Sequence, residues 1–225
     1  MLKKLLRSPR LTANIRRTGS NRMCGISSVM YKSNLSKGTD QVGSNLVKML
    51  ESMTHRGKDS CGVTIAGQKH EGDFIIRMWA KNPERTESAL KKVEDTLNKI
   101  SAVVLTKQSN GSFIRLTLKY DGEIGCLAGS LMETREVVLH SIGETSEVIK
   151  DVGTPVMMDQ KHNVGHLKGT HGIGHVRMAT ESKVDISHAH PFWAYPFSDV
   201  TVVHNGQLTN YYKLRRMYED SGLFF

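Results

Sequence analysis

Long apolar runs are missing from this sequence of 225 residues: no stretch of eighteen apolar residues occurs, so no membrane-spanning helix is expected. Cysteine is also scarce. Cys24, Cys61 and Cys126 are odd in number, widely spaced and without a CxxC pair, which argues against a disulfide framework or a cysteine zinc site. With 38% hydrophobic and 24% charged residues, the composition indicates a soluble globular protein with one domain of ordinary size. We therefore expect a reducing compartment, the cytoplasm, and no membrane partner.

Acidic residues are absent from the first 22 positions, although seven of the 31 lysine and arginine residues lie there. These seven are Lys3, Lys4, Arg7, Arg10, Arg16, Arg17 and Arg22. The rest of the chain holds 24 basic residues against 22 acidic ones, so its charge is almost balanced. Outside the arm, electrostatics give no reason to expect a nucleic-acid groove, and no nucleic-acid partner is expected.

This basic arm, residues 1–22, has three interpretations. Its arginine-rich composition, with serine and threonine, suits a leader or a transit peptide for organellar import. A disordered basic tail has the same composition. The third interpretation is a mis-assigned start, with translation beginning at Met23, and we favour it because of the residues that follow.

Hydrophobic periodicity predicts short strands mixed with amphipathic helices. Helices are expected at 43–54, 83–100 and 211–218, and strands at 25–30, 61–66, 74–78, 102–106, 113–120, 137–141, 172–178 and 200–204. The segment from Gly67 to Gly72 predicts a hairpin between the second and third of these strands. Ser109-Asn110-Gly111 predicts a turn between the fourth and fifth. Strands outnumber helices in a mixed order, so the expected fold class is α+β.

Four short segments carry residue types suited to chemistry: 23–26 (MCGI), 55–60 (HRGKDS), 174–180 (GHVRMAT) and 203–206 (VHNG). In this order they resemble the class II glutamine amidotransferases. That resemblance implies the N-terminal nucleophile hydrolase fold, an αββα sandwich, over residues 23–225. The stretch 187–214 looks closest to the amidotransferase subunits of glutamate-synthase-like and N-methylglutamate-synthase-like complexes.

Cys24 is the expected nucleophile. A thiol attacks as the thiolate, so it needs a base or a lowered pKa. Removal of Met23 and everything before it would give Cys24 a free α-amine, whose reference pKa of about 7.7 to 8.0 leaves a good fraction neutral near pH 7. That amine can act as general base toward its own thiol. Without the other three segments, a buried structural cysteine would be the simpler interpretation.

The resemblance implies roles for four further residues. Arg177 would hold the α-carboxylate of glutamine by two parallel hydrogen bonds, and Thr180 would help to shape the pocket. The side-chain amide of Asn205 and the backbone N–H of Gly206 would stabilise the oxyanion formed when the glutamine amide is attacked. The simpler alternatives are a surface ion pair for Arg177 and an Asn-Gly hairpin turn at Asn205.

Five other residues of these segments are expected to line the pocket rather than to do chemistry: His55, Arg56, Gly57, Asp59 and His204. Among them, Arg56 and Asp59 are interpreted as a structural pair that holds the loop between the first helix and the second strand.

The ten histidines raise a metal hypothesis, because His162 and His166, like His171 and His175, have the four-residue spacing that suits zinc on a helix. Intervening glycines break any helix here and no HExxH motif occurs, so hydrogen-bonded core or loop histidines are the preferred interpretation. We expect neither a metal nor a cofactor in this domain. By the resemblance, a flavin or an iron–sulfur cluster would belong to a synthase partner.

Two stretches of the chain depart from the resemblance. Residues 81–168 exceed what the catalytic core needs, so we expect an inserted subdomain or a docking surface for a partner there. The family's acidic segment, which binds the substrate's α-amine, would follow the helix at 211–218 and has no counterpart here. We therefore expect the domain to be truncated at its C-terminus, as a fragment or a shortened product.

The expected activity is hydrolysis of glutamine to glutamate and ammonia through a thioester on Cys24. The ammonia would pass to a synthase subunit, of the glutamate-synthase-like kind by the resemblance. Two other functions stay open. One is an N-terminal-nucleophile hydrolase that acts on another amide, and the other is a non-catalytic regulatory or interaction module of the same fold.

Overall fold

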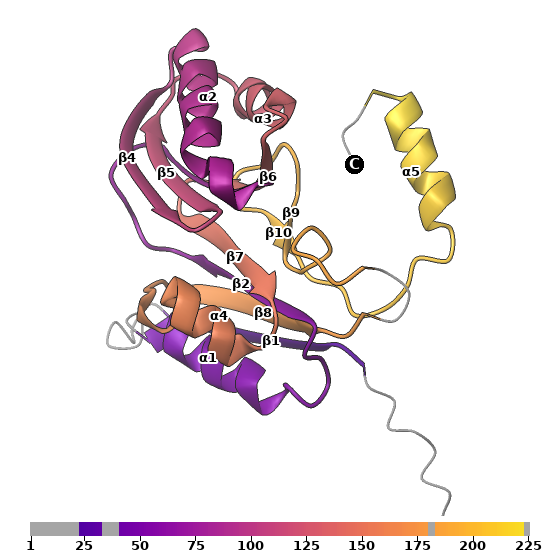
Figure 1. The fold of residues 1–225 in the computed structure, drawn as a ribbon. Coiled ribbons are helices and arrows are strands. Elements are labelled where there is room, and N and C mark those ends of the chain that lie inside the picture. The colour runs from indigo at the N-terminus through magenta and orange to yellow at the C-terminus, as the bar shows by residue number, and fades with distance from the viewer. Residues whose placement is uncertain (1–22, 33–40, 180–182, 223–225) are drawn as a thin grey trace, which may run out of the picture.

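The computed structural model describes residues 23–32, 41–179 and 183–222, and they form two four-stranded antiparallel sheets (Figure 1). The first sheet has the order β1 (Gly25–Met30), β8 (His171–Arg177), β2 (Ser60–Ala66) and β7 (Ser146–Val152). The second has the order β4 (Val103–Asn110), β5 (Phe113–Lys119), β3 (Phe74–Ala80) and β6 (Val137–Gly143).

Each sheet is covered by two helices on its outer side (Figure 1). The first sheet carries α1 (Val42–Ser52) and α4 (Pro155–His162), and the second carries α2 (Thr86–Lys99) and α3 (Ile124–Glu133). The layers therefore follow one another as helices, sheet, sheet, helices. This is the α+β class and the αββα sandwich that the sequence predicts.

Amphipathic periodicity explains why α1 and α2 form and how they pack. In α1, Leu46 and Leu50 are fully buried against the first sheet, and in α2 Val93 and Leu97 are fully buried against the second. Each such side chain stabilises the fold by about 1.5 to 3 kcal/mol relative to exposure. The expected first turn at Pro83 is a short 3₁₀ segment, Pro83–Arg85, that leads directly into α2.

The predicted hairpin between the second and third strands is wrong. β2 pairs with β7 and β8, whereas β3 pairs with β5 and β6, so the chain crosses from one sheet to the other after Ala66. All seven residues of β2 are buried, as befits a central strand. The crossing loop uses Gly67 and Gly72 at φ values of +92° and +98°, where only glycine is unstrained.

Periodicity did not predict α3, α4 and β7, among other elements. Strand β7 returns the chain from the second sheet to the first. Helix α4 is capped by Thr154, whose hydroxyl accepts the Met157 N–H at 3.4 Å. Residues 81–168 thus contribute strands to both sheets of the sandwich. The expected turn at 109–111 is shifted by one residue, since β4 and β5 are joined by Gly111 and Ser112.

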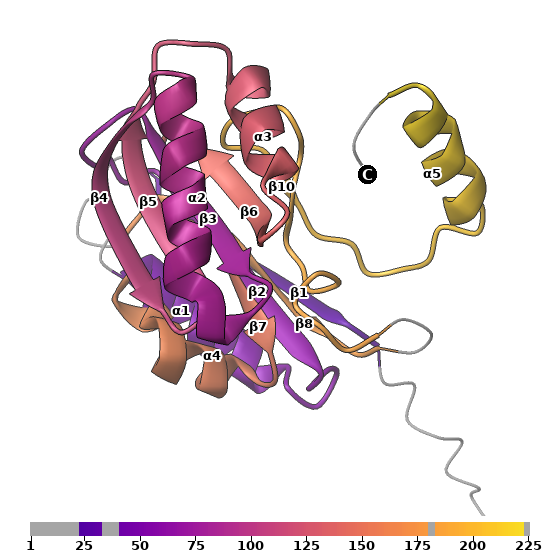
Figure 2. The same ribbon diagram turned by 45° about the horizontal axis from the view of Figure 1, so that its top comes forward.

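Beyond β8 the chain forms a small ribbon of β9 (Phe192–Trp193) and β10 (Thr201–Val202), followed by α5 (Tyr211–Asp220). The expected strand at 200–204 is therefore only two residues long. No residue of α5 is buried, and the helix lies apart from both sheets in the two views (Figures 1 and 2). Among the described residues, none of the helices has the length and apolarity needed to cross a membrane.

Candidate active site

The ends of three neighbouring strands converge at one edge of the first sheet. The pairing places Gly25 of β1 opposite Val176 of β8, and Ser60 of β2 opposite Arg177. As a result Cys24, just before β1, lies beside Met178, just after β8. Segments that are 154 residues apart in the sequence thereby become neighbours.

Cys24 is half-buried, and its sulfur and carbonyl oxygen both have hydrogen-bond partners. Its Sγ lies 3.4 Å from the backbone nitrogen of Met178, which is placed to donate to the sulfur. Its carbonyl oxygen accepts two hydrogen bonds, from Arg56 Nε at 3.2 Å and from Asn205 Nδ2 at 2.8 Å. The structure therefore brings residues of all four sequence segments together at Cys24.

Arg56 and Asp59 do not form the expected pair: within the described residues each has a different partner. Arg56 contacts the Cys24 carbonyl, while Asp59 Oδ2 accepts the backbone N–H of Ala179 at 2.7 Å. The Asp59 N–H also donates to the Arg177 carbonyl at 3.1 Å. Asp59 thus ties the loop before β2 to the segment that follows Arg177.

Gly57 allows the loop to approach this segment closely. A Cβ added there would lie 2.5 Å from the carbonyl carbon of Arg177 and 2.8 Å from the Met178 nitrogen, closer than any real Cβ contact. Glycine at this position is explained by backbone contact rather than by contact with a substrate.

Arg177 is buried, with 6% of its surface exposed, and its Nη1 donates to the Lys183 carbonyl at 3.1 Å. Thr180, expected beside it, lies outside the described residues. His55 is exposed at the end of α1, where its Nδ1 is 3.1 Å from the Ser52 carbonyl oxygen. This contact ties His55 to α1 rather than to the segments around Cys24.

Two histidines that the sequence did not single out for this site hold the backbone of His204. The Nε2–H of His175 donates to the His204 carbonyl at 3.1 Å, and the His204 N–H donates to His190 Nδ1 at 3.3 Å. The rings of His175 and His190 are stacked with centroids 4.5 Å apart. Both backbone groups of His204 are therefore engaged, directly before Asn205 and Gly206.

Burial keeps both supporting histidines neutral near pH 7. It lowers the pKa of His175 to about 4, and burial together with the neighbouring His175 lowers the pKa of His190 to about 3. Neutral His190 can accept the His204 N–H through Nδ1, whereas the imidazolium form cannot. These two histidines are identified by their contacts with the backbone carbonyl and N–H of His204, and no sequence motif encodes such contacts.

The other two cysteines have different surroundings. Cys61 is fully buried in β2, with its Sγ 3.8 Å from Met158 Sδ, and burial raises the pKa of its thiol to about 12. Cys126, in α3, is exposed. Of the histidines with four-residue spacing, His162 pairs with Asp151 at 2.9 Å, while His175 lies in the His204 contact described above.

The arrangement suits attack on an amide carbonyl. The Cys24 thiol lies beside the backbone of Met178, the residue that follows buried Arg177, and the Asn205 side-chain amide donates to the Cys24 carbonyl. A guanidinium can bind a carboxylate in bidentate fashion, and fixed N–H donors can stabilise an oxyanion.

Comparisons with known proteins agree with this chemistry, although no protein-family model matches the chain. A protein of Methanothermobacter thermautotrophicus named "Putative glutamine amidotransferase" is 34% identical over 208 residues, covering 90% of this chain and 67% of that protein. The glutamine amidotransferase-like protein GlxB of Rhizobium meliloti is 32% identical over 203 residues, covering 90% of this chain and 65% of that protein.

A more limited similarity extends to a chloroplastic amidophosphoribosyltransferase 2 of Arabidopsis thaliana, which is 35% identical over 109 residues. That match covers 48% of this chain and 18% of the plant protein. The chain spans about two thirds of the length of the two relatives from Methanothermobacter and Rhizobium.

Proposed function

The chain belongs to the class II glutamine amidotransferases, and we propose that it hydrolyses the side-chain amide of glutamine with Cys24 as the nucleophile. One observation supports this most directly. The Asn205 amide donates to the Cys24 carbonyl at 2.8 Å, which brings the expected oxyanion donor and the expected nucleophile together across 181 residues of chain.

The reaction begins with a free α-amine on Cys24, so the active form would lack residues 1–23. The neutral amine takes the proton of the thiol, and the thiolate sulfur attacks the amide carbon of glutamine. Ammonia leaves with a proton from the ammonium group, and a thioester to Cys24 remains. Water, deprotonated by the same amine, then cleaves the thioester to release glutamate and the thiol.

The oxyanion of each tetrahedral intermediate would accept hydrogen bonds from the Asn205 side-chain amide and the Gly206 backbone N–H. Electrostatic stabilisation of this kind depends on donors that are already in place before reaction. The contacts of His175 and His190 with the His204 backbone support such preorganisation, because they restrain the segment that leads into these two donors.

The α-carboxylate of glutamine would bind Arg177, with Thr180 alongside. Burial of the guanidinium among few competing waters strengthens such an ion pair. We further propose that the released ammonia passes to a synthase subunit of the glutamate-synthase-like kind, in the cytoplasm, where a reducing environment preserves the thiol.

The test is a glutaminase assay on the chain that begins at Cys24. Glutamate and ammonia should form at equal rates, and Cys24→Ala should abolish both, whereas Cys61→Ala and Cys126→Ala should retain activity. Equal losses from all three substitutions would refute the assignment of Cys24. Activity of a chain that still begins at Met1 would refute the α-amine as the base, and turnover of another amide but not glutamine would favour the other hydrolase function.

A further inference from the structure

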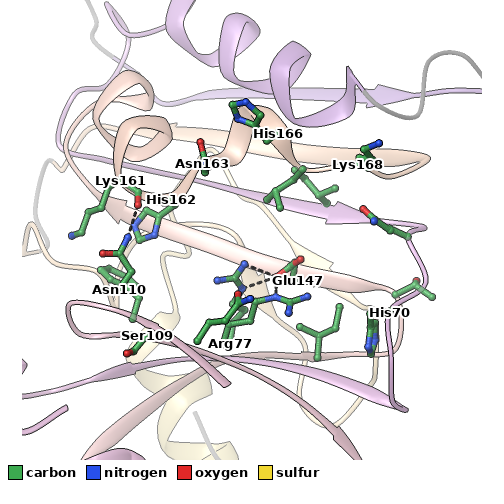
Figure 3. A pocket seen from close by; sticks show the side chains of 18 of the residues that line it. His70, Arg77, Ser109, Asn110, Glu147, Lys161, His162, Asn163, His166 and Lys168 are labelled. Carbon is green, nitrogen blue, oxygen red and sulfur yellow. Dashed lines mark hydrogen bonds and ion pairs between the residues drawn. The ribbon is translucent and has the colours of Figure 1, made fainter. Parts of the chain in front are cut away.

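A cavity whose lining is drawn in Figure 3 lies at the other end of β2 and β8 from Cys24, where the two sheets meet near α4. Its volume is about 570 Å³, within the range of about 300 to 1,000 Å³ of small-molecule sites. Ile65, near the end of β2, and Leu167, just before β8, belong to its lining. Since β2 begins at Ser60, beside the candidate active site, roughly 20 Å of strand separates the two places.

The lining is strongly biased in charge. It contains one carboxylate, Glu147, and three histidines. It also contains five lysine and arginine side chains, contributed by both sheets and the loops around α4: Lys69, Arg77, Arg115, Lys161 and Lys168. A concave surface of this composition attracts anions because low-dielectric walls focus its positive potential.

Two of these cations form an unusual pair on the cavity wall. Arg77 of β3 and Arg115 of β5 lie directly opposite each other in the sheet register. Two like charges in such a position destabilise a sheet. Their side chains are only 17% and 19% exposed. Burying two guanidinium groups side by side needs negative charge nearby.

Glu147 of β7 supplies part of that charge from the other sheet. Arg77 Nε and Arg115 Nε both donate to the same oxygen, Oε2, at 2.6 Å and 3.0 Å (Figure 3). One carboxylate therefore serves two guanidinium groups, and this buried triad keeps a net charge of +1. An anion bound in the cavity would remove that excess.

The opposite wall is held in place and is closer to neutral. Lys161 Nζ lies 2.8 Å from Asp151 and 4.6 Å from the centre of the Phe113 ring. The Asn110 side chain, at the tip of the β4–β5 hairpin, donates to the Lys161 carbonyl and so connects the second sheet to α4. The cavity thus combines the net positive charge of the Arg77–Arg115–Glu147 triad with a wall on which Lys161 is already paired with Asp151.

We propose that this cavity binds a metabolite-sized phosphate ester, with its phosphate group at Arg77 and Arg115. A phosphate carries more negative charge than one carboxylate and accepts the forked hydrogen bonds that guanidinium groups donate. Amide and hydroxyl side chains elsewhere in the lining, among them Gln68, Gln108 and Ser109, suit hydroxyl groups on the rest of the ligand. The site is separate from glutamine hydrolysis at Cys24.

Isothermal titration of the full chain with two phosphate esters, ribose 5-phosphate and adenosine 5′-monophosphate, tests the proposal. Ribose, which lacks a phosphate, and citrate, which carries carboxylates instead, serve as control ligands. At least one phosphate ester should bind, and Arg115→Gln should weaken its binding by about tenfold. That variant retains the balanced Arg77–Glu147 pair. Lys69→Gln, at an exposed lining residue, should also weaken binding and carries little risk of misfolding.

Two further variants complete the test. Lys91→Gln, on the exposed face of α2 away from the cavity, should bind like the wild type, and Glu147→Gln should bind at least as tightly because it removes the competing carboxylate. Absence of binding by every phosphate compound would overturn the proposal. So would equal weakening by Lys91→Gln and the two lining substitutions, or binding of citrate alone.

Discussion

Gly57→Ala is the substitution that most directly tests how the loop before β2 positions the candidate active site. The added methyl carbon would lie 2.5 Å from the carbonyl carbon of Arg177, whereas ordinary contacts begin at 3.4 Å. The two backbone segments must therefore separate by about 0.9 Å, the difference between these distances. That movement would stretch the hydrogen bond from the Asp59 N–H to the Arg177 carbonyl, now 3.1 Å long.

The magnitude follows from two contributions. Overpacking in a rigid environment costs about 1 to 3 kcal/mol, and loss of one hydrogen bond costs about 1 kcal/mol more. Gly57→Ala should thus lower the free energy of unfolding by about 2 to 4 kcal/mol. It should also reduce kcat/KM for glutamine by about tenfold or more, because the Met178 N–H that faces Cys24 Sγ would move with Arg177.

Urea denaturation and a glutaminase assay measure the two effects. Gly129→Ala is the matched control, since the same change in the interior of α3 meets no atom within 4 Å. It should stabilise the protein by about 0.5 to 1 kcal/mol and leave kcat/KM unchanged. If Gly57→Ala unfolds at the same urea concentration as Gly129→Ala and is as active, the close approach of the loop to Arg177 does not position this site.

Three further predictions concern kinetics, pH and thiol reactivity. Arg177→Ala should mainly raise KM, whereas Asn205→Ala should lower kcat by about 10² to 10³, and steady-state kinetics with the reverse pattern would mean that their roles are exchanged. Burial lowers the pKa of His175 to about 4 and that of His190 to about 3, below the unfolded value of about 6.5, so unfolding takes up protons in this window. The contribution of the two neutral histidines to the free energy of unfolding should be full above pH 6.5. It should fall as the pH drops, by about 2 kcal/mol at pH 5 for His175 alone. A free energy of unfolding, measured by urea denaturation, that stays constant from pH 7.5 to 5 would contradict this. Iodoacetamide at pH 8 should modify the exposed cysteine of α3 long before Cys61, whose burial raises its pKa to about 12, and peptide mass spectrometry showing equal rates would contradict the buried position.

Hydrophobic periodicity predicted the amphipathic helices, in which buried apolar positions recur at regular spacing along the chain. The apolar positions of α1 and α2 recur every three to four residues, so each of these helices can be recognised locally, and each forms part of one outer layer of the sandwich. Strand pairing is different, because β2 and β3 are neighbours in sequence yet belong to different sheets. A strand's partner depends on which distant segment buries its faces, and adjacency along the chain does not determine that.

The same division applies to the site. From the sequence we could predict which side chains are candidates for chemistry, because a thiol, a guanidinium and an amide each lie in a recognisable short segment at Cys24, Arg177 and Asn205. The tertiary structure was needed to show that Arg56 contacts the Cys24 carbonyl instead of Asp59. It was also needed to show that His175 donates to the carbonyl of His204. Nearly every residue has a backbone carbonyl and an N–H group, whatever its side chain. The identity of a residue therefore does not indicate whether its backbone binds a distant side chain, and that contact depends on the long-range fold.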